Sequence, residues 1–338
     1  MKRLLLIVAL LVSPVALFAQ AADRDILLTS NGTLYTIESR QNDAPDVIDS
    51  PRYLALTIQN GQNVIKTNVP ASITGGNNWE PALAFDSESN TLFVFWLHSP
   101  NTILGANELL FCPFQNGKWG TPTSVEDVPY HFRYNLRVGV TRSVQVTDST
   151  GTSKQIPGLT VHAAWWDDSA ASEGARYAML TIDKGIVTDI ARRDLIDFIN
   201  TANLGIFSLD DASKEILRHP IVFESSGHDT IDVVFGDMLT NTMHRLTLKP
   251  VLQSRVRIPI GVRDTSYPAP RQRITADAHL GGVASSPSSL ALYYMGNGQV
   301  RYLTYENGAW SGEKTITLTN EVSADAAVAA IRRMVSGD

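Results

Sequence analysis

The sequence contains a single cysteine, Cys112, so the chain cannot form a disulfide bond within itself. Charged residues are also scarce, at 18% of the 338 residues, whereas 43% are apolar. A chain with this many apolar side chains can bury a large core, and its composition excludes a disordered, collagen-like or coiled-coil protein. Stability therefore has to come from packing and not from covalent cross-links.

Basic residues are outnumbered, because 28 lysines and arginines stand against 34 aspartates and glutamates, for a net charge of −6. Nucleic-acid affinity comes largely from clustered Lys and Arg, so we expect no nucleic-acid partner. The seven histidines are scattered, and no loop has the residue order of a dedicated calcium site. We therefore expect neither a metal ion nor a cofactor.

Long apolar runs are absent except at the N-terminus, and no later stretch approaches the roughly 18 consecutive apolar residues of a membrane-spanning helix. Lys2 and Arg3 precede an apolar segment, which is followed by the small-residue sequence Ala19-Gln20-Ala21. These are the parts of a secretory signal peptide. We expect residues 1–21 to be removed on export and the mature chain to be a periplasmic or secreted monomer without a membrane span. An uncleaved membrane anchor is the alternative.

The rest of the chain repeats one layout of four short strands separated by polar turns. In the clearest copy the strands are expected at 81–85, 91–96, 108–114 and 118–125. The most specific internal match is between Asn116-Gly117-Lys118-Trp119 of this copy and Asn307-Gly308-Ala309-Trp310 of the last one. Asn-Gly between two strands is a strong hairpin signal, because both residues tolerate positive φ.

Five copies are found, with first strands beginning near residues 25, 79, 136, 219 and 279. The period is about 58 residues once an insertion of about 25 residues is removed; this insertion, at 191–217, has helical apolar spacing. The repeat predicts an all-β fold over residues 22–322, a β-propeller of about five four-stranded blades. Six blades and a two-sheet sandwich are the alternatives. Residues 323–338 are expected to form an amphipathic helix packed on the propeller.

The blade spacing over residues 76–320 and the two Asn-Gly-x-Trp turns resemble the sialidase-like β-propeller superfamily. The turns look like degenerate relatives of its Asp box, which reads Ser-x-Asp-x-Gly-x-Thr-Trp, with the Asp and Thr absent here. The superfamily includes sialidases, related glycoside hydrolases and noncatalytic proteins that bind sugars or proteins. The resemblance therefore implies a propeller with one of these roles, and the Asp-box turn itself implies only a structural role.

Residues just before the first strands of the blades are the best placed to meet a ligand, because first strands line the channel of a propeller. An aromatic ring can stack on a sugar while carboxylates, imidazoles and guanidinium groups fix its hydroxyls. We therefore predict the ligand-binding residues to be Trp79, Glu80, Arg137, Arg218, His219, Asp277 and His279. The alternative is that Glu80 and the histidines hold neighbouring blades in register.

Three functions follow from this arrangement. The leading hypothesis is an exported, noncatalytic β-propeller that binds a glycan or a protein at the channel-facing end of the ring. The first alternative is a glycoside hydrolase, which needs two carboxylates across the scissile bond; Glu80 with Asp277 would be that pair. The second alternative is a structural scaffold in a cell-envelope assembly. No residue is assigned a catalytic role from the sequence.

Overall fold

The computed structural model describes most of the chain beyond the expected signal peptide. The described residues are 24–29, 31–41, 51–73, 75–99, 108–126, 132–148, 150–168, 173–198, 220–224, 229–237, 242–253, 255–270, 279–286, 289–296, 299–318, 327, 330, 331, 333 and 334. Residues 1–21 and most of the expected helical insertion lie outside this set. No helix within it is long and apolar enough to cross a membrane.

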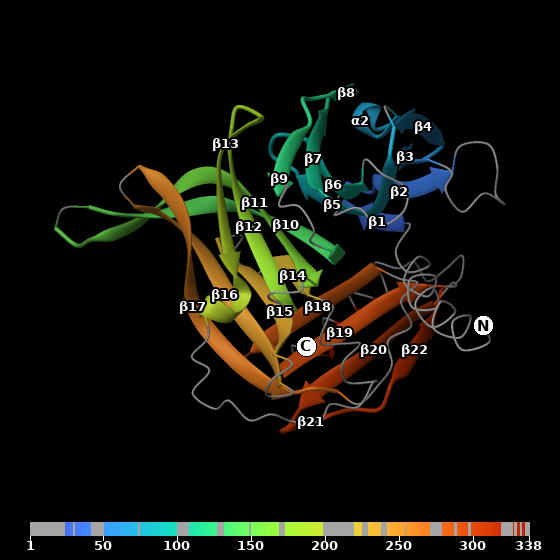
Figure 1. Cartoon of the computed structure of the whole chain (residues 1–338). Coiled ribbons are helices and arrows are strands. Elements are labelled where there is room, and N and C mark those ends of the chain that lie inside the picture. Colours follow the sequence, from blue (N-terminus) through green and yellow to red (C-terminus); the bar gives the residue numbers. More distant parts are fainter. Residues whose placement is uncertain are drawn as a thin grey trace, which may run out of the picture.

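Blades 1 and 2 are antiparallel meanders, in which each strand pairs with the next one in the chain (Figure 1). Blade 1 contains β1 (Arg24–Leu28), β2 (Leu34–Gln41), β3 (Arg52–Asn60) and β4 (Asn63–Asn68). After the short helix α2 (Pro70–Ile73), blade 2 contains β5 (Asn77–Asp86), β6 (Thr91–Ser99), β7 (Glu108–Gln115), β8 (Lys118–Trp119) and β9 (Thr123–Glu126). The last two segments form one interrupted outer strand, since both pair with β7.

Blades 3, 4 and 5 repeat the same order. Blade 3 contains β10 (Phe132–Thr147), β11 (Ser153–Asp168), β12 (Glu173–Asp183) and β13 (Ile186–Asp194). Blade 4 contains β14 (Ile221–Glu224), β15 (Ile231–Asp237), β16 (Thr242–Gln253) and β17 (Val256–Pro268). Blade 5 contains β18 (His279–Ser286), β19 (Ser289–Gly296), β20 (Gln299–Glu306), β21 (Ala309–Trp310) and β22 (Lys314–Thr317). Its outer strand is interrupted in the same way as that of blade 2.

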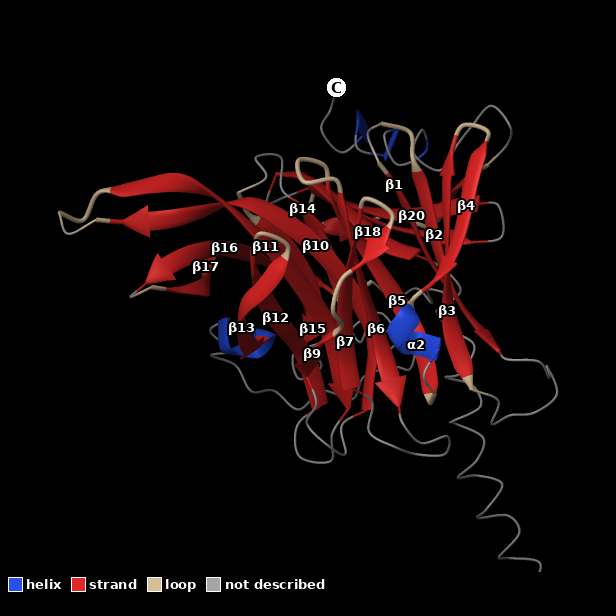
Figure 2. Ribbon diagram, turned by 90° about the horizontal axis from the view of Figure 1, so that it is seen from above, coloured by secondary structure: helices blue, strands red, loops and turns tan. Residues whose placement is uncertain are grey.

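The first strands of the five blades surround the centre of the ring. β1 packs against β5, β5 against β10, β10 against β14, β14 against β18, and β18 against β1. This closed cycle of contacts makes the fold a five-bladed β-propeller, as the repeat predicts. Blades 3 and 4 share a short parallel pairing of β10 with β16, and the long hairpins β10–β11 and β16–β17 project from one side of the ring (Figure 2).

Blades 2 to 5 bury apolar side chains on both of their faces, because successive residues of a strand point to opposite sides. The buried apolar side chains described in blade 1 belong to the core that it shares with blade 2. In β11, Trp165 belongs to the core shared with blade 2, whereas the adjacent Trp166 belongs to the core shared with blade 4. Both tryptophans are at most 2% exposed. The high apolar content of the sequence is therefore used at the blade interfaces.

The two Asn-Gly-x-Trp sequences form the hairpin turns that the sequence predicts, with positive φ at both Asn and Gly. Each turn also places a tryptophan against the preceding blade. The indole Nε1 of Trp119 donates to Thr67 Oγ1 of blade 1 at 3.3 Å, and that of Trp310 donates to the carbonyl oxygen of Pro268 of blade 4 at 2.6 Å. The repeated sequence is thus a contact between blades, and its relation to an Asp box stays a prediction.

The start of the predicted helical insertion differs from the sequence interpretation. Strand β13 continues through Asp194, because residues 191–194 pair with β12 in regular antiparallel register. Only a single 3-10 turn, η1 (Leu195–Phe198), follows within the described residues. The cross-strand pairing therefore outweighs the helical spacing of the apolar residues at this point.

Helical residues near the C-terminus pack on blade 5. Ala327 and Ile331 are buried in a cluster with side chains of β19 and β20. Met334 is 45% exposed, and its sulfur accepts a hydrogen bond from the Tyr302 hydroxyl at 3.7 Å. Of the described helical residues, Ala327 and Ile331 thus face blade 5.

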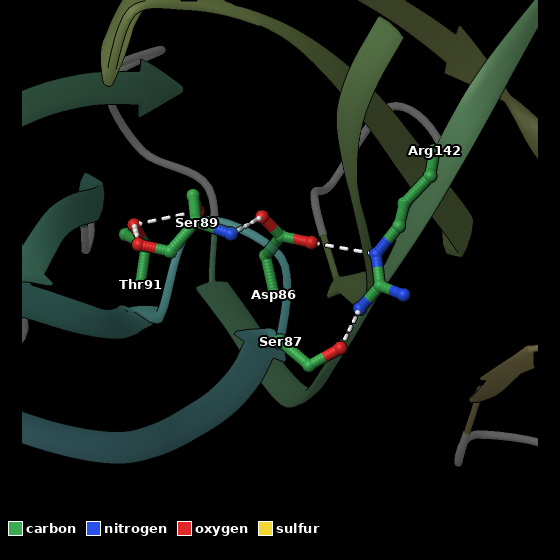
Figure 3. A network of polar contacts seen from close by, with 5 residues as sticks. All are labelled: Asp86, Ser87, Ser89, Thr91 and Arg142. Atoms are coloured by element: carbon green, nitrogen blue, oxygen red, sulfur yellow. Dashed lines mark hydrogen bonds and ion pairs between the residues drawn. The ribbon is translucent and has the colours of Figure 1, made fainter. Parts of the chain in front are cut away.

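A polar network joins blade 2 to blade 3 at the end of β5 (Figure 3). Arg142 of β10 donates from Nε to Asp86 Oδ1 at 2.6 Å and from Nη2 to Ser87 Oγ at 2.8 Å. The other carboxylate oxygen of Asp86 accepts the backbone N–H of Ser89 at 2.9 Å. Burial by itself would raise the pKa of Asp86, but these hydrogen bonds outweigh it, and the pKa is lowered.

We expect Arg142→Ala to reduce the free energy of unfolding by about 1–3 kcal/mol, because it leaves the buried Asp86 carboxylate without its charged partner. Urea denaturation measures this change. Arg40→Ala is the matched control, since Arg40 pairs with Glu38 on the surface, where an ion pair contributes at most about 1 kcal/mol. An equal effect of the two substitutions would contradict the stabilising role of the network.

Candidate functional site

Inner strands β5 and β10 share an irregularity near their starts. The pairing register shifts at residues 79–82 of β5 and at 134–137 of β10. Inside these bulges Glu80 and Asn135 have φ angles of 46° and 59°. Among the described residues, the remaining non-glycine residues with positive φ lie in connections between paired strands; they are Asn90, Asn116, Lys184, Arg255 and Asn307. Bulges that redirect side chains are common beside active sites.

Charged side chains from three successive inner strands gather at this end of the ring. They are Asp25 of β1, Glu80 of β5 and Arg137 of β10, which we call the carboxylate–arginine cluster. Asp25 Oδ2 accepts the backbone N–H of Leu83 at 2.7 Å, and Glu80 Oε2 accepts that of Leu136 at 3.3 Å. In both bonds, a carboxylate on one inner strand accepts a backbone N–H of the next inner strand. Both carboxylates also interact electrostatically with Arg137.

Arg137 is the basic member of the cluster. Its Nη1 donates to the carbonyl oxygen of Leu136 at 2.6 Å, and its Nε is shielded from solvent and has no hydrogen-bond partner among the described residues. Burial lowers the pKa of Arg137, whereas Asp25 and Glu80 raise it. The guanidinium group keeps its charge at physiological pH, because arginine is not deprotonated in proteins. A charged group therefore interacts with two acids at the channel end.

Three of the seven predicted ligand-binding residues have described side chains. Glu80 and Arg137 belong to the carboxylate–arginine cluster, and Trp79 is half-buried against the core between blades 2 and 3. The other four are His279, of which only the backbone at the start of β18 is described, and Arg218, His219 and Asp277, which lie outside the described residues. Ligand binding by all seven stays a prediction.

Sequence reasoning missed two residues of this region. Asp25 lies in the first copy of the repeat, which resembles the other copies least. The only sequence feature that could have indicated it is its position, as one acid in front of the apolar run Ile26-Leu27-Leu28. Asn135 occupies in β10 the place that Glu80 occupies in β5, directly after an aromatic residue. The residue type could have indicated this backbone conformation, because asparagine tolerates the left-handed conformation better than most residues. Aligning the first strands of the blades would have revealed it.

Other chemistries have little support in the described part of the chain. The thiol of Cys112 is buried in β7, and burial raises its pKa to about 12, which leaves it unreactive at neutral pH. No group of three or more His, Cys, Asp or Glu side chains within the described residues could hold a metal ion. The chemistry that these residues offer is therefore that of carboxylates and a guanidinium group.

No protein-family model and no curated protein matches the sequence. Among solved structures, the Hadza microbial sialidase Hz136 has 12% identity and a TM-score of 0.47; the aligned region covers 88% of this chain and 58% of the sialidase chain. The α-L-arabinofuranosidase ARB93A from Fusarium graminearum has 13% identity and a TM-score of 0.44, with 88% and 77% covered. The GH43_1 enzyme from Xanthomonas citri has 12% identity and a TM-score of 0.38, with 92% and 94% covered.

This chain thus spans 58% of the length of that sialidase. All three TM-scores are below 0.5. The blade assignment accordingly rests on the strand pairing and on the closed cycle of inner-strand contacts within this chain.

Proposed function

We propose that the protein is a glycoside hydrolase whose reacting groups belong to the carboxylate–arginine cluster. The observation that carries the proposal is the backbone of Glu80, which a bulge in an inner strand holds in a left-handed conformation beside Asp25 and Arg137. Such a conformation costs on the order of 1–3 kcal/mol in a non-glycine residue and is concentrated at functional sites. Glycosidic bond cleavage needs two carboxyl groups, one as acid and one as nucleophile or base.

Glu80 fits the reacting group better than Asp25 does. One oxygen of each acid is held by a backbone N–H of the next inner strand, but the Glu80 side chain is half-buried whereas Asp25 is only 7% exposed. Arg137 beside both carboxylates can stabilise negative charge or donate to a sugar hydroxyl. In this assignment Glu80 is the carboxyl group that meets the substrate directly and Asp25 is the second carboxyl group of the pair. Arg137 sets the electrostatic environment of the bond to be cleaved.

Noncatalytic binding of a glycan at the same cluster is the second candidate. A specific observation favours it, since Asp25 and Glu80 each accept a backbone N–H from the next inner strand. These bonds link blades 1, 2 and 3 at the channel end and so serve the fold, as the alternative interpretation of Glu80 expects. Carboxylates held in this way can still fix sugar hydroxyls without turnover. Export, the monomeric state and a scaffold role stay predictions from the sequence.

A panel of aryl glycosides and neutral oligosaccharides separates the two candidates. Release of the aryl group or of new reducing ends by the purified protein supports the hydrolase. Saturable binding in calorimetry without product release favours the noncatalytic role. Neither turnover nor binding of any member of the panel would contradict both proposals.

A further inference from the structure

A cleft of about 360 Å³ lies beside the outer strands of blade 3. It is at the same end of the ring as the carboxylate–arginine cluster, because Asp167 in its wall pairs in register with Arg133, near the start of β10. Its charged wall residues are Glu126 of β9, Asp167 of β11, Arg176 of β12, Arg192, Arg193 and Asp194 of β13, and Asp197 of η1.

The acids in the wall are held by arginines of the protein itself. Glu126 Oε2 lies 3.2 Å from Arg192 Nε, and Glu126 Oε1 lies 3.9 Å from Nη2 of Arg133. Nε of Arg133, a residue only 1% exposed, is 3.8 Å from Asp167 Oδ2. The ion pairs fix the directions of the remaining donors and acceptors, and they leave little net charge on this side of the cleft.

The opposite side of the cleft comes from β12 and β13. Arg176 forms an ion pair with Asp194, which also lines the cleft. Arg193 is exposed; its Nη1 donates to the carbonyl oxygen of Arg192 at 2.8 Å, and it forms no ion pair with the described residues. The ring of Trp165 contributes an apolar part of the wall. The guanidinium group of Arg193 thus keeps donors that can point into the cleft.

We infer that this cleft is a second subsite, which binds one neutral sugar ring of the glycan taken by the channel site; the inference rests on the proposed function. A volume of about 360 Å³ is near the lower end for ligand pockets, so it suits one ring. Carboxylates and guanidinium groups in fixed positions accept from and donate to hydroxyls. Arg193 in the cleft wall is on β13, three strands away from Arg137 on β10, which is on the order of 14 Å, so one ligand contacting both sites must contain several rings.

Charge balance selects a neutral ring over an acidic one. Arg193 would attract an anion, but Asp194 and Asp197 stand in the same wall and would repel it. A neutral ring meets no such conflict, because it uses the polar atoms of the ion pairs without displacing them. Its affinity should consequently depend little on salt, since screening acts on net charges.

The experiment measures calorimetric binding of thio-linked neutral oligosaccharides of increasing length, which resist hydrolysis. In the wild type, affinity should increase about tenfold once the chain reaches the cleft, as expected for a hydrogen bond to a charged group. Arg193→Ala should lose this gain and keep the disaccharide affinity. Lys184→Ala, an exposed turn residue between the same two strands, should keep both.

Equal affinity at every length, or a gain in affinity that Arg193→Ala leaves intact, would overturn the subsite and leave the channel site standing. Failure of every length to bind would overturn the subsite together with the proposed function. An oligosaccharide that ends in a uronic acid tests whether the cleft prefers a neutral or an acidic ring. If it bound more tightly than the neutral one and lost this advantage at high salt, the cleft would be an anion site and the neutral-ring assignment would be wrong.

Discussion

Glu80→Gln is expected to lower kcat for a cleaved aryl glycoside by at least about a hundredfold, the usual contribution of a positioned acid or base. Glutamine keeps the size of the side chain, and its amide oxygen can still accept the N–H of Leu136, so the fold should be retained. It cannot donate a carboxylic proton or act as a nucleophile. The measurement is kcat on the best substrate of the panel, with circular dichroism and thermal unfolding to verify the fold.

Glu88→Gln is the matched control for this substitution. Glu88 lies in the exposed turn at the other end of β5, so the same chemical change there should leave kcat unchanged. Wild-type kcat in the Glu80→Gln enzyme would show that Glu80 only links blades 2 and 3. In that case the noncatalytic candidate would be favoured, provided that the glycan still binds.

Stability is expected to fall steeply as the pH decreases from about 6.5, because blade 3 buries a neutral histidine. His162 Nε2 lies 2.8 Å from Thr141 Oγ1, and its Nδ1 lies 2.5 Å from the Tyr177 hydroxyl. All three side chains are 0% exposed. Burial lowers the pKa of His162 from 6.5 to about 3 and raises that of Tyr177 well above its ordinary value.

The sign of the effect follows from proton binding in the two states. Between about pH 6.5 and pH 3 the unfolded chain binds a proton at His162 and the folded chain does not, so protons favour unfolding. Each unit of pKa difference corresponds to about 1.4 kcal/mol, which gives a loss on the order of 4–5 kcal/mol by pH 3. Above about pH 6.5 this contribution to the stability is fully present.

Comparing the pH dependence of stability in the wild type and in His162→Gln separates the contribution of His162 from that of the carboxylates, which titrate in both proteins. The amide of glutamine can replace part of the hydrogen bonding, and we expect the variant to be about 1–3 kcal/mol less stable at neutral pH. Urea denaturation at a series of pH values should show the wild-type advantage shrinking as the pH falls and reversing before pH 3, because the loss linked to His162 exceeds the difference at neutral pH. Parallel pH profiles would show that His162 is not the group that titrates on unfolding.

Part of the candidate site could be predicted from the sequence, because the repeat locates the starts of the inner strands. That reasoning selected Glu80 and Arg137, which the structure places in one cluster. It did not select Asp25, because the first copy of the repeat is weak and a single acid before an apolar run is a common pattern. The predicted partner of Glu80, Asp277, lies outside the described residues, whereas Asp25 interacts electrostatically with the same Arg137 as Glu80 does.

The sequence by itself predicted the repeated four-strand layout and about five blades, since alternating apolar strands and Asn-Gly turns are local patterns that recur along the chain. The closed cycle of inner-strand contacts decided for five over six. Its composition also ruled out internal disulfides. Only the tertiary structure decided which charged groups share the channel end and that β13 extends to Asp194. Closure of the ring brings together inner strands that are far apart in the chain, and bulges turn Glu80 and Asn135. Both depend on packing between distant residues, which no local pattern contains.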